Sequence, residues 1–296
     1  MRYLNQDLYK EVAMVYYHLP GLFEFFDLYV VFMDMFSHER YKFRNCEIGS
    51  IYGAPTGTIW NGGRIRNSAF SDINNVNDWS VGENIHCGLT FTNCKIGPEH
   101  LDNIFCNEIA RLFEREGNTI TVESPLLEEY LRQKYPKYKF VSSTTKCIRD
   151  FTLLEEELAK PYKRVVLDYN FNKDFKVLKS IEQKDKCELL ANAVCYPNCP
   201  RRRAHYEYIS ESALRIPHDD DFVCDAMTRP LFMVLDNPNT ITVDAIFNTY
   251  EPLGYHHFKL EGRTASISDL IETLVYYTVK PEFQLEIRQK LNSIFQ

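Results

Sequence analysis

Cysteines are the residues of this sequence whose spacing first suggests chemistry. In ANAVCYPNCPRRRAH, residues 191–205, Cys195 and Cys199 are separated by Tyr-Pro-Asn, and Cys224 follows 25 residues later. Thiolates are the ligands that zinc and iron–sulfur clusters prefer. These three cysteines are therefore candidate ligands of a metal centre, either a [4Fe–4S] cluster or a zinc ion. Free structural thiols, packed as small apolar side chains, are the alternative that the residues leave equally open.

A fourth ligand is not evident from the local sequence. Structural zinc sites usually show two Cys or Cys/His pairs, and the second pair is missing here. A C-x3-C-x2-C cluster motif also fails, because Arg202 stands where the third cysteine would be. Cys94 and Cys147, each after the end of a predicted strand, and His205 in the same loop are the three candidates.

Acidic and basic residues follow several predicted strands and form a second candidate site. Glu123, Asp168, Glu261 and Arg263 come at or just after such strands, and we predict them as catalytic residues. With Arg64 they could line a charged pocket that holds an anionic small molecule or transfers protons. The alternative is a structural network of ion pairs at the same end of the fold.

The element pattern predicts the fold that brings these residues together. Short β-rich runs alternate with helical patterns, and parallel strands need such crossovers. The predicted strands span residues 46–54, 84–93, 118–124, 138–145, 164–170, 187–193, 230–237 and 256–263. Eight such units predict a (β/α)8 TIM-like barrel, whose chemistry gathers at the carboxyl ends of the strands.

An open doubly wound sheet is the second choice of fold, but the glycine pattern of a dinucleotide-binding fold is absent. WNGGR, residues 60–64, lacks the G-x-G-x-x-G spacing. Its two glycines predict a tight turn, with a backbone anion site as the alternative.

The N-terminal region reads as helical, so we predict a helical extension over residues 1–44 and a barrel-like domain over 45–296. The predicted helix breaks at Leu19-Pro20. Aromatic side chains of this region either belong to the core or form a surface for a protein partner. They are Phe23, Phe25, Phe26, Tyr29 and Phe32.

Composition limits the classes of function. Apolar residues make up 45% of the 296 residues, enough for a real core, and the formal net charge of −7 disfavours bulk binding of DNA. No export signal is visible, and charged residues interrupt the most apolar stretch. We therefore expect a cytoplasmic protein with reduced thiols and no membrane span.

Three stretches resemble the U32 peptidase-like family: ELLANAVCYPNCPRRRAHY, GYHHFKLEGR and TITVESPLLEEYLRQKYP. The resemblance covers about residues 85–285. It implies a barrel-like α/β fold and, in many members, a four-cysteine [4Fe–4S] cluster that assists oxygen-independent hydroxylation of RNA bases or quinone precursors. By position, Cys195, Cys199 and Cys224 become cluster ligands, and Glu261 and Arg263 belong to the signature strand. The family's cysteine-rich block is here reduced to C-x3-C.

The leading hypothesis is therefore an iron–sulfur enzyme or enzyme subunit acting on a small molecule or a nucleic-acid base. A hydrolase is the second hypothesis, although neither a G-x-S-x-G nor an H-E-x-x-H motif is present. A non-catalytic binding or scaffold protein is the third. Three consecutive arginines, Arg201, Arg202 and Arg203, have three possible roles: they neutralise a cluster, contact an RNA phosphate, or lie in a solvated loop. We favour the solvated loop.

Overall fold

The strands of the chain close into one parallel barrel. The computed structural model describes residues 14–65, 73–224 and 230–295, and in these the strands are neighbours in chain order from β1 to β8, with β8 returning to β1. The strands are β1 Val15–Pro20, β2 Cys46–Gly53, β3 Cys87–Phe91, β4 Thr119–Val122, β5 Lys139–Ser142, β6 Arg164–Val166, β7 Cys187–Leu190 and β8 His257–Lys259. The predicted (β/α)8 TIM-like barrel is confirmed.

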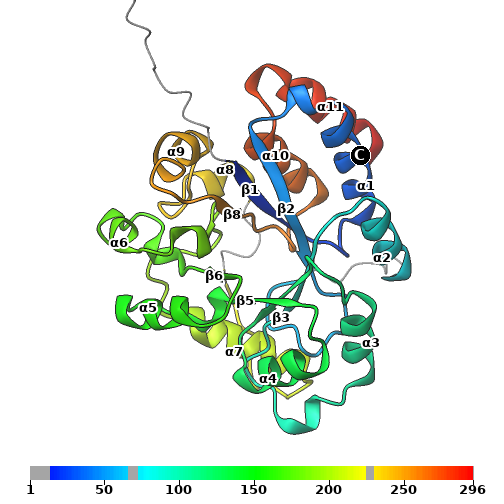
Figure 1. Cartoon of the computed structure of the whole chain (residues 1–296), viewed down its shortest axis with the longest axis vertical. Helices are drawn as coiled ribbons and strands as arrows, with labels where there is room; N and C mark the ends of the chain where they lie inside the picture. Colours follow the sequence, from blue (N-terminus) through cyan, green and yellow to red (C-terminus); the bar gives the residue numbers. More distant parts are fainter. Residues whose placement is uncertain (1–13, 66–72, 225–229, 296) are drawn as a thin grey trace, which may run out of the picture.

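Helices surround the barrel and connect its strands (Figure 1). They are α1 Phe26–His38, α2 Ile73–Gly82, α3 Ile104–Leu112, α4 Pro125–Lys134, α5 Phe151–Ala159, α6 Phe175–Ser180, α7 Arg202–Ala213, α8 Leu231–Leu235, α9 Val243–Ala245, α10 Ile267–Thr278 and α11 Gln284–Phe295. Side-chain caps begin several of them: Ser124 accepts from the Leu127 N–H ahead of α4, and Thr242 accepts from the Ala245 N–H ahead of α9.

Two strand predictions are wrong. Residues 15–20, predicted as helix, form β1, which pairs with β2 and β8 so that Tyr16 lies opposite both Glu47 and His257. Residues 230–237, predicted as a strand, contain the helix α8. Both segments are short apolar runs, and periodicity alone does not distinguish a buried strand from a buried helix over such a length.

The predicted helical extension over residues 1–44 is consequently also wrong for its described part. β1 closes the barrel, and α1 is the crossover between β1 and β2, so a boundary at residue 44 would cut through the domain. Residues 1–13 lie outside the described residues. Four of the five aromatic side chains considered as a partner surface are buried in the core, because α1 packs between barrel and C-terminal helix α11. They are Phe23, Phe25, Tyr29 and Phe32.

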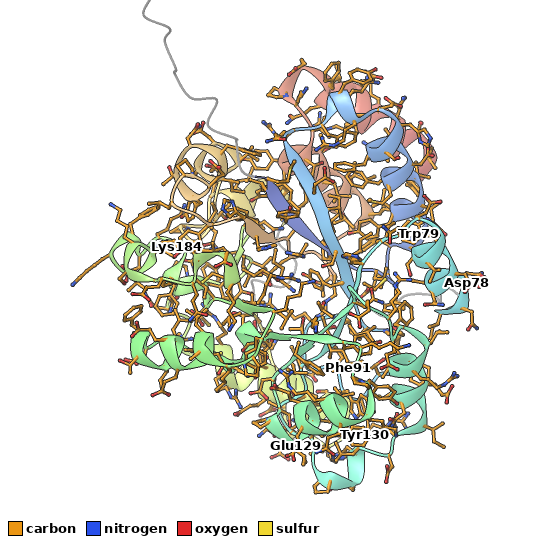
Figure 2. The ribbon with its side chains drawn as sticks, viewed as in Figure 1. Asp78, Trp79, Phe91, Glu129, Tyr130 and Lys184 are labelled. Carbon is orange, nitrogen blue, oxygen red and sulfur yellow. The ribbon has the colours of Figure 1, made fainter. Side chains whose placement is uncertain are left out.

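Apolar and aromatic side chains fill the layer between strands and helices. Trp60 packs edge-on against Phe91 and Tyr130, at ring-centroid distances of 5.2 and 6.0 Å. Figure 2 shows Phe91 and Tyr130 within this layer, whereas Asp78 and Glu129 lie at the surface. This packed scaffold fixes the carboxyl ends of the strands, which all open toward one end of the barrel.

Candidate active site and cysteine pocket

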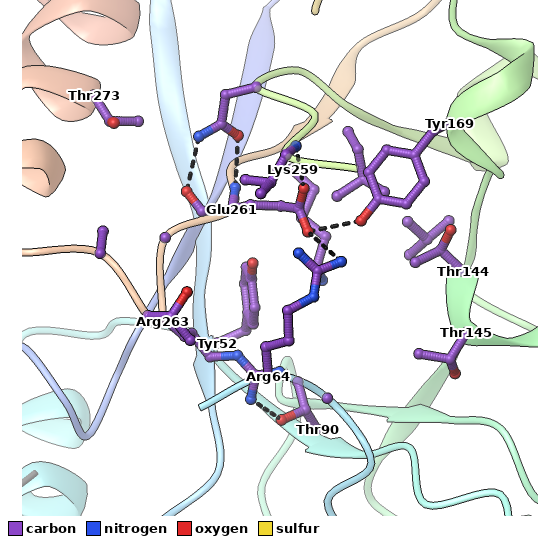
Figure 3. A pocket seen from close by; sticks show the side chains of 18 of the residues that line it. Tyr52, Arg64, Thr90, Thr144, Thr145, Tyr169, Lys259, Glu261, Arg263 and Thr273 are labelled. Carbon is purple, nitrogen blue, oxygen red and sulfur yellow. Dashed lines mark hydrogen bonds and ion pairs between the residues drawn. The ribbon is translucent and has the colours of Figure 1, made fainter. Parts of the chain in front are cut away.

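A cavity of about 320 Å³ lies at the carboxyl ends of the barrel strands (Figure 3). Threonine and serine hydroxyl groups and tyrosine side chains line it, together with three cationic side chains, Arg64, Lys259 and Arg263. The hydroxyl-bearing side chains include Thr90, Thr92, Thr121, Ser143, Thr144, Thr145 and Thr273. Such a pocket, lined by both apolar and hydrogen-bonding side chains, has the size and character of a small-molecule site.

Glu261 is held rigidly at this cavity, as its predicted role requires. Its carboxylate accepts hydrogen bonds from the Tyr169 hydroxyl (2.7 Å) and the Val194 N–H (2.8 Å). The Asn192 side chain exchanges two hydrogen bonds with the Glu261 backbone, at 2.6 and 2.8 Å. Glu261 thus lies at the barrel mouth, its catalytic role stays a prediction, and Asn192 fixes its backbone.

Arg263 also lines the cavity, on the side of the WNGGR stretch. Its guanidinium donates to Thr90 Oγ1 at 2.9 Å and to Asn61 Oδ1 at 3.2 Å. A Cβ on Gly63 would collide with this guanidinium, and a Cβ on Gly62 would lie 2.7 Å from Asn93 Cα. Close approach of the Thr92–Asn93 main chain, not a turn with φ > 0, is therefore what requires a glycine at Gly62.

Lys259, at the end of β8, connects the cavity to a charged network inside the barrel. Its ammonium lies 3.7 Å from the centre of the Tyr52 ring and 3.3 Å from Glu188 Oε1. The other Glu188 oxygen accepts from Arg164 at 2.6 Å and lies 3.6 Å from His18 Nε2. Burial lowers the pKa of Lys259, and burial also lowers the pKa of His18.

This interior network was missed at the level of sequence. Its signal was present: Glu188 and Lys259 are charged residues inside otherwise apolar strands, and such residues are almost never buried without partners. The place of His18 in this network was not predicted, because its strand β1 was predicted as a helix.

Glu123 and Asp168, the other two predicted catalytic residues, do not line the cavity. Asp168 accepts two hydrogen bonds from Arg202 Nη1, both 2.8 Å, and Arg203 donates to Glu123 Oε1 at 2.8 Å. Both arginines come from the start of α7. The alternative interpretation, a structural set of ion pairs, describes these two carboxylates.

The three consecutive arginines are therefore not a solvated loop. Arg202 is fully buried and also donates to the Tyr196 carbonyl at 2.9 Å. Arg201 is the exposed member, and its guanidinium lies 4.3 Å from the centre of the Phe222 ring. Pairing with Asp168 explains why Arg202 can be buried, whereas Arg203, paired with Glu123, stays 43% exposed.

A second pocket, of about 360 Å³, collects the three predicted cysteine ligands. Cys195, Cys199 and Cys224 all line it, together with His205 of α7. His205 stacks on Phe222 at a centroid distance of 4.5 Å, and burial lowers its pKa to about 4, so the imidazole is neutral near pH 7. Segments separated by 25 residues thus line one cavity.

The other two candidates for a fourth ligand lie elsewhere. The thiol of Cys94 is 3.3 Å from Ser210 Oγ, and Cys147 occupies a left-handed backbone position with φ of 53°. Neither lines the cysteine pocket. Burial raises the pKa of Cys147 to about 11, which disfavours the thiolate form.

The cysteine pocket fits a thiolate-bound metal centre by its donor set, although its ligands are not drawn together. Three thiols and a neutral imidazole are donors that iron–sulfur clusters and zinc accept. Within residues 14–65, 73–224 and 230–295, however, no group of three or more His, Cys, Asp or Glu side chains lies at metal-binding distance. Binding of a metal centre would therefore need these four donors to approach one another.

Arg64 connects the two pockets. One nitrogen, Nη2, lies 3.4 Å from Cys195 Sγ, 3.5 Å from the Tyr206 hydroxyl and 3.9 Å from Glu261 Oε1. Its side chain is only 10% exposed. A single buried guanidinium thus touches a cysteine of one pocket and the central carboxylate of the other.

Comparisons with known proteins agree with this architecture. No protein-family model and no curated protein matches the sequence. Among solved structures, the chain is similar to the U32 peptidase Mk0906, with a TM-score of 0.54 and 13% identity over 84% of this chain and 93% of that chain. The likeness shows a U32-like fold, as the sequence resemblance implied. Among the helices of the described residues, none has the length and apolar character of a membrane span.

Proposed function

We propose that the chain is an iron–sulfur protein of U32-like type, a redox enzyme or enzyme subunit that acts on a small molecule or a nucleic-acid base in the barrel cavity. The observation that carries the proposal is the convergence of Cys195, Cys199, Cys224 and His205 on one pocket directly beside that cavity. The U32-like fold agrees with it.

The four side chains of the pocket would hold the cluster, with His205 as the fourth ligand. A bound [4Fe–4S] cluster would supply electron transfer or an open iron for substrate. Around it, the chain's own residues have defined tasks. Glu261, fixed by Tyr169 and Asn192, presents a carboxylate to a bound substrate, and Arg64 keeps positive charge between that carboxylate and Cys195.

The two other hypotheses receive less support. Hydrolases of the serine or cysteine type need a base beside the nucleophile, and no histidine of the described residues lines the central cavity. His257 lies inside the barrel against His18, 3.1 Å between ring nitrogens, rather than at the mouth. A scaffold role would not require a polar cavity closed by fixed side chains.

Anaerobic purification with analysis of iron, sulfide and zinc tests the proposal. We expect about four irons and four sulfides per chain and an absorbance band at about 400 nm. Cys195→Ser should lose the iron, and Cys94→Ser is the matched control that should keep it. Stoichiometric zinc without sulfide would show that the pocket binds zinc and not an iron–sulfur cluster. Metal-free protein under these conditions would refute both the iron–sulfur proposal and the zinc alternative.

A further inference from the structure

The charges that line the barrel cavity do not balance. Three cations face it, Arg64, Lys259 and Arg263, against two carboxylates, Glu261 and Asp269. Asp269 belongs to the rim, where it accepts from the Ser266 hydroxyl at 2.7 Å as part of the cap of α10. One positive charge is therefore in excess, and the side chains of Arg64 and Lys259 are only 10% and 11% exposed, so that uncompensated charge is costly there.

Charged side chains that lie near the cavity without lining it do not neutralise this excess positive charge. The charges of Arg164 and Glu188 cancel each other, with Nε and Oε2 2.6 Å apart, so Glu188 does not fully neutralise Lys259 as well. Glu24 is the remaining nearby carboxyl: burial raises its pKa and the charge of Arg263 lowers it, but no ion pair within 4.0 Å joins these two described residues.

Arg263 is the cation with the clearest capacity for a further partner. Its hydrogen bonds go to the neutral oxygens of Asn61 and Thr90, and among the described residues no carboxylate lies within 4.0 Å of its guanidinium. A guanidinium presents five donors in a planar fork that matches carboxylate and phosphate geometry. Arg263 therefore has donors available for an anion in the cavity.

The rest of the wall limits the kind of anion. Val166, Leu190 and Val234 supply apolar surface, and threonine and serine hydroxyls supply hydrogen bonds. A volume of about 320 Å³ is at the small end of ligand pockets. The wall suits a small organic anion with a hydrogen-bonding body, not a polymer.

We propose that the barrel cavity binds a small organic anion, a carboxylate or a phosphate monoester, whose charged group is held by Arg263 and Lys259. The inference rests on the proposed function only in that it assigns the substrate class of that same cavity; binding of the anion does not itself require the cluster.

Isothermal titration at constant ionic strength, with succinate and with inorganic phosphate as probes and succinamide as the uncharged control, tests the inference. We expect saturable binding of at least one anion and none of succinamide. Binding of succinate alone identifies a carboxylate ligand, and binding of phosphate alone identifies a phosphate ester. Arg263→Gln and Lys259→Met should each weaken binding about tenfold or more.

Two control variants separate the loss of an anion partner from a folding defect. Arg263→Lys retains the charge without the planar fork and guards against a folding defect, and we expect an intermediate affinity. Arg288→Gln, which loses a cation of α11 paired with Glu272 at 2.6 Å, should bind like the parent protein. No binding of either anion, or unchanged binding in both cavity variants, overturns the inference.

Measuring iron in the same samples separates this inference from the proposed function. Iron-loaded protein that binds no anion would refute only the anion site. Metal-free protein that binds anions through Arg263 would refute only the iron–sulfur proposal.

Discussion

Replacing Asp168 by Asn tests whether the ion pair behind the cysteine pocket holds that part of the molecule together. Asp168 and Arg202 are each 1% exposed, and two hydrogen bonds of 2.8 Å join them. Asparagine keeps the size of the side chain and can still accept from the Asn170 N–H, so the substitution removes the charge and little else.

The expected loss follows from the burial of Arg202. Removing one partner of a buried ion pair leaves the other charge uncompensated and costs about 3–5 kcal/mol. Asparagine can still accept one hydrogen bond from Arg202, so we expect the lower end of that range. A domain with about 5–15 kcal/mol of stability would lose a large part of it.

Urea unfolding of Asp168→Asn, measured beside Glu207→Gln, provides the comparison. Glu207 pairs with Arg203 at 2.9 Å, but the two side chains are 36% and 43% exposed, so its loss should cost less than about 1 kcal/mol. Adding Arg202→Met to Asp168→Asn should restore part of the stability, because the stranded charge is removed. Equal, small effects of Asp168→Asn and Glu207→Gln would refute the reasoning.

The same substitution has a functional consequence. Arg202 also donates to the Tyr196 carbonyl, in the loop between Cys195 and Cys199. Loosening Arg202 should therefore lower the iron content of the purified protein along with its stability.

Three further predictions concern packing and pH. Gly62→Ala should destabilise by about 1–3 kcal/mol, because a Cβ there collides with main-chain atoms, whereas Gly82→Ala, with no heavy atom within 4 Å of its Cβ, should be neutral in the same melts. Burial opposes ionisation of Glu157, but hydrogen bonds from two lysines and a serine lower its pKa to about 2. Its contribution of about 3 kcal/mol to the free energy of unfolding is therefore present above pH 4.5 and is lost as the pH falls to 2. Glu157→Gln should flatten this part of the stability profile, and an unchanged slope would contradict the prediction. Burial lowers the pKa of His257 to about 4. Its contribution to the free energy of unfolding is therefore present above about pH 6.5 and is lost as the pH falls toward 4. His257→Asn should reduce that loss, and an unchanged stability profile would contradict the prediction.

The sequence predicted the barrel better than it predicted the individual strands. Seven of the eight predicted strands contain β2 to β8 at the expected places, because alternation with helices is visible over long stretches. The total of eight was nevertheless right through two opposite errors. Residues 15–20 were missed as a strand and residues 230–237 were wrongly added, since pairing across the barrel decides the state of such short apolar runs.

For the site residues too, the sequence predicted their position along a strand but not their partners in three dimensions. Glu261 and Arg263 were predictable because each follows a strand whose end must open at the barrel mouth. Glu123 and Asp168 obey the same rule, yet arginines 80 and 34 residues away pair with them. Position along a strand thus predicts which end of the barrel a side chain occupies, but not which partner it has there.

Arg64 implies that the two pockets do not act independently. A guanidinium that is 10% exposed needs anionic partners, and Glu261 at 3.9 Å is a distant one. Burial raises the pKa of Cys195, so without metal its thiol gives Arg64 a neutral neighbour. On the proposed function, metal ligation makes this sulfur anionic and places a counter-charge 3.4 Å from Arg64. The guanidinium would then have less attraction left for Glu261 or for an anion in the cavity, so occupancy of the cysteine pocket should weaken anion binding next door, and by linkage a bound anion should weaken metal retention by the same factor.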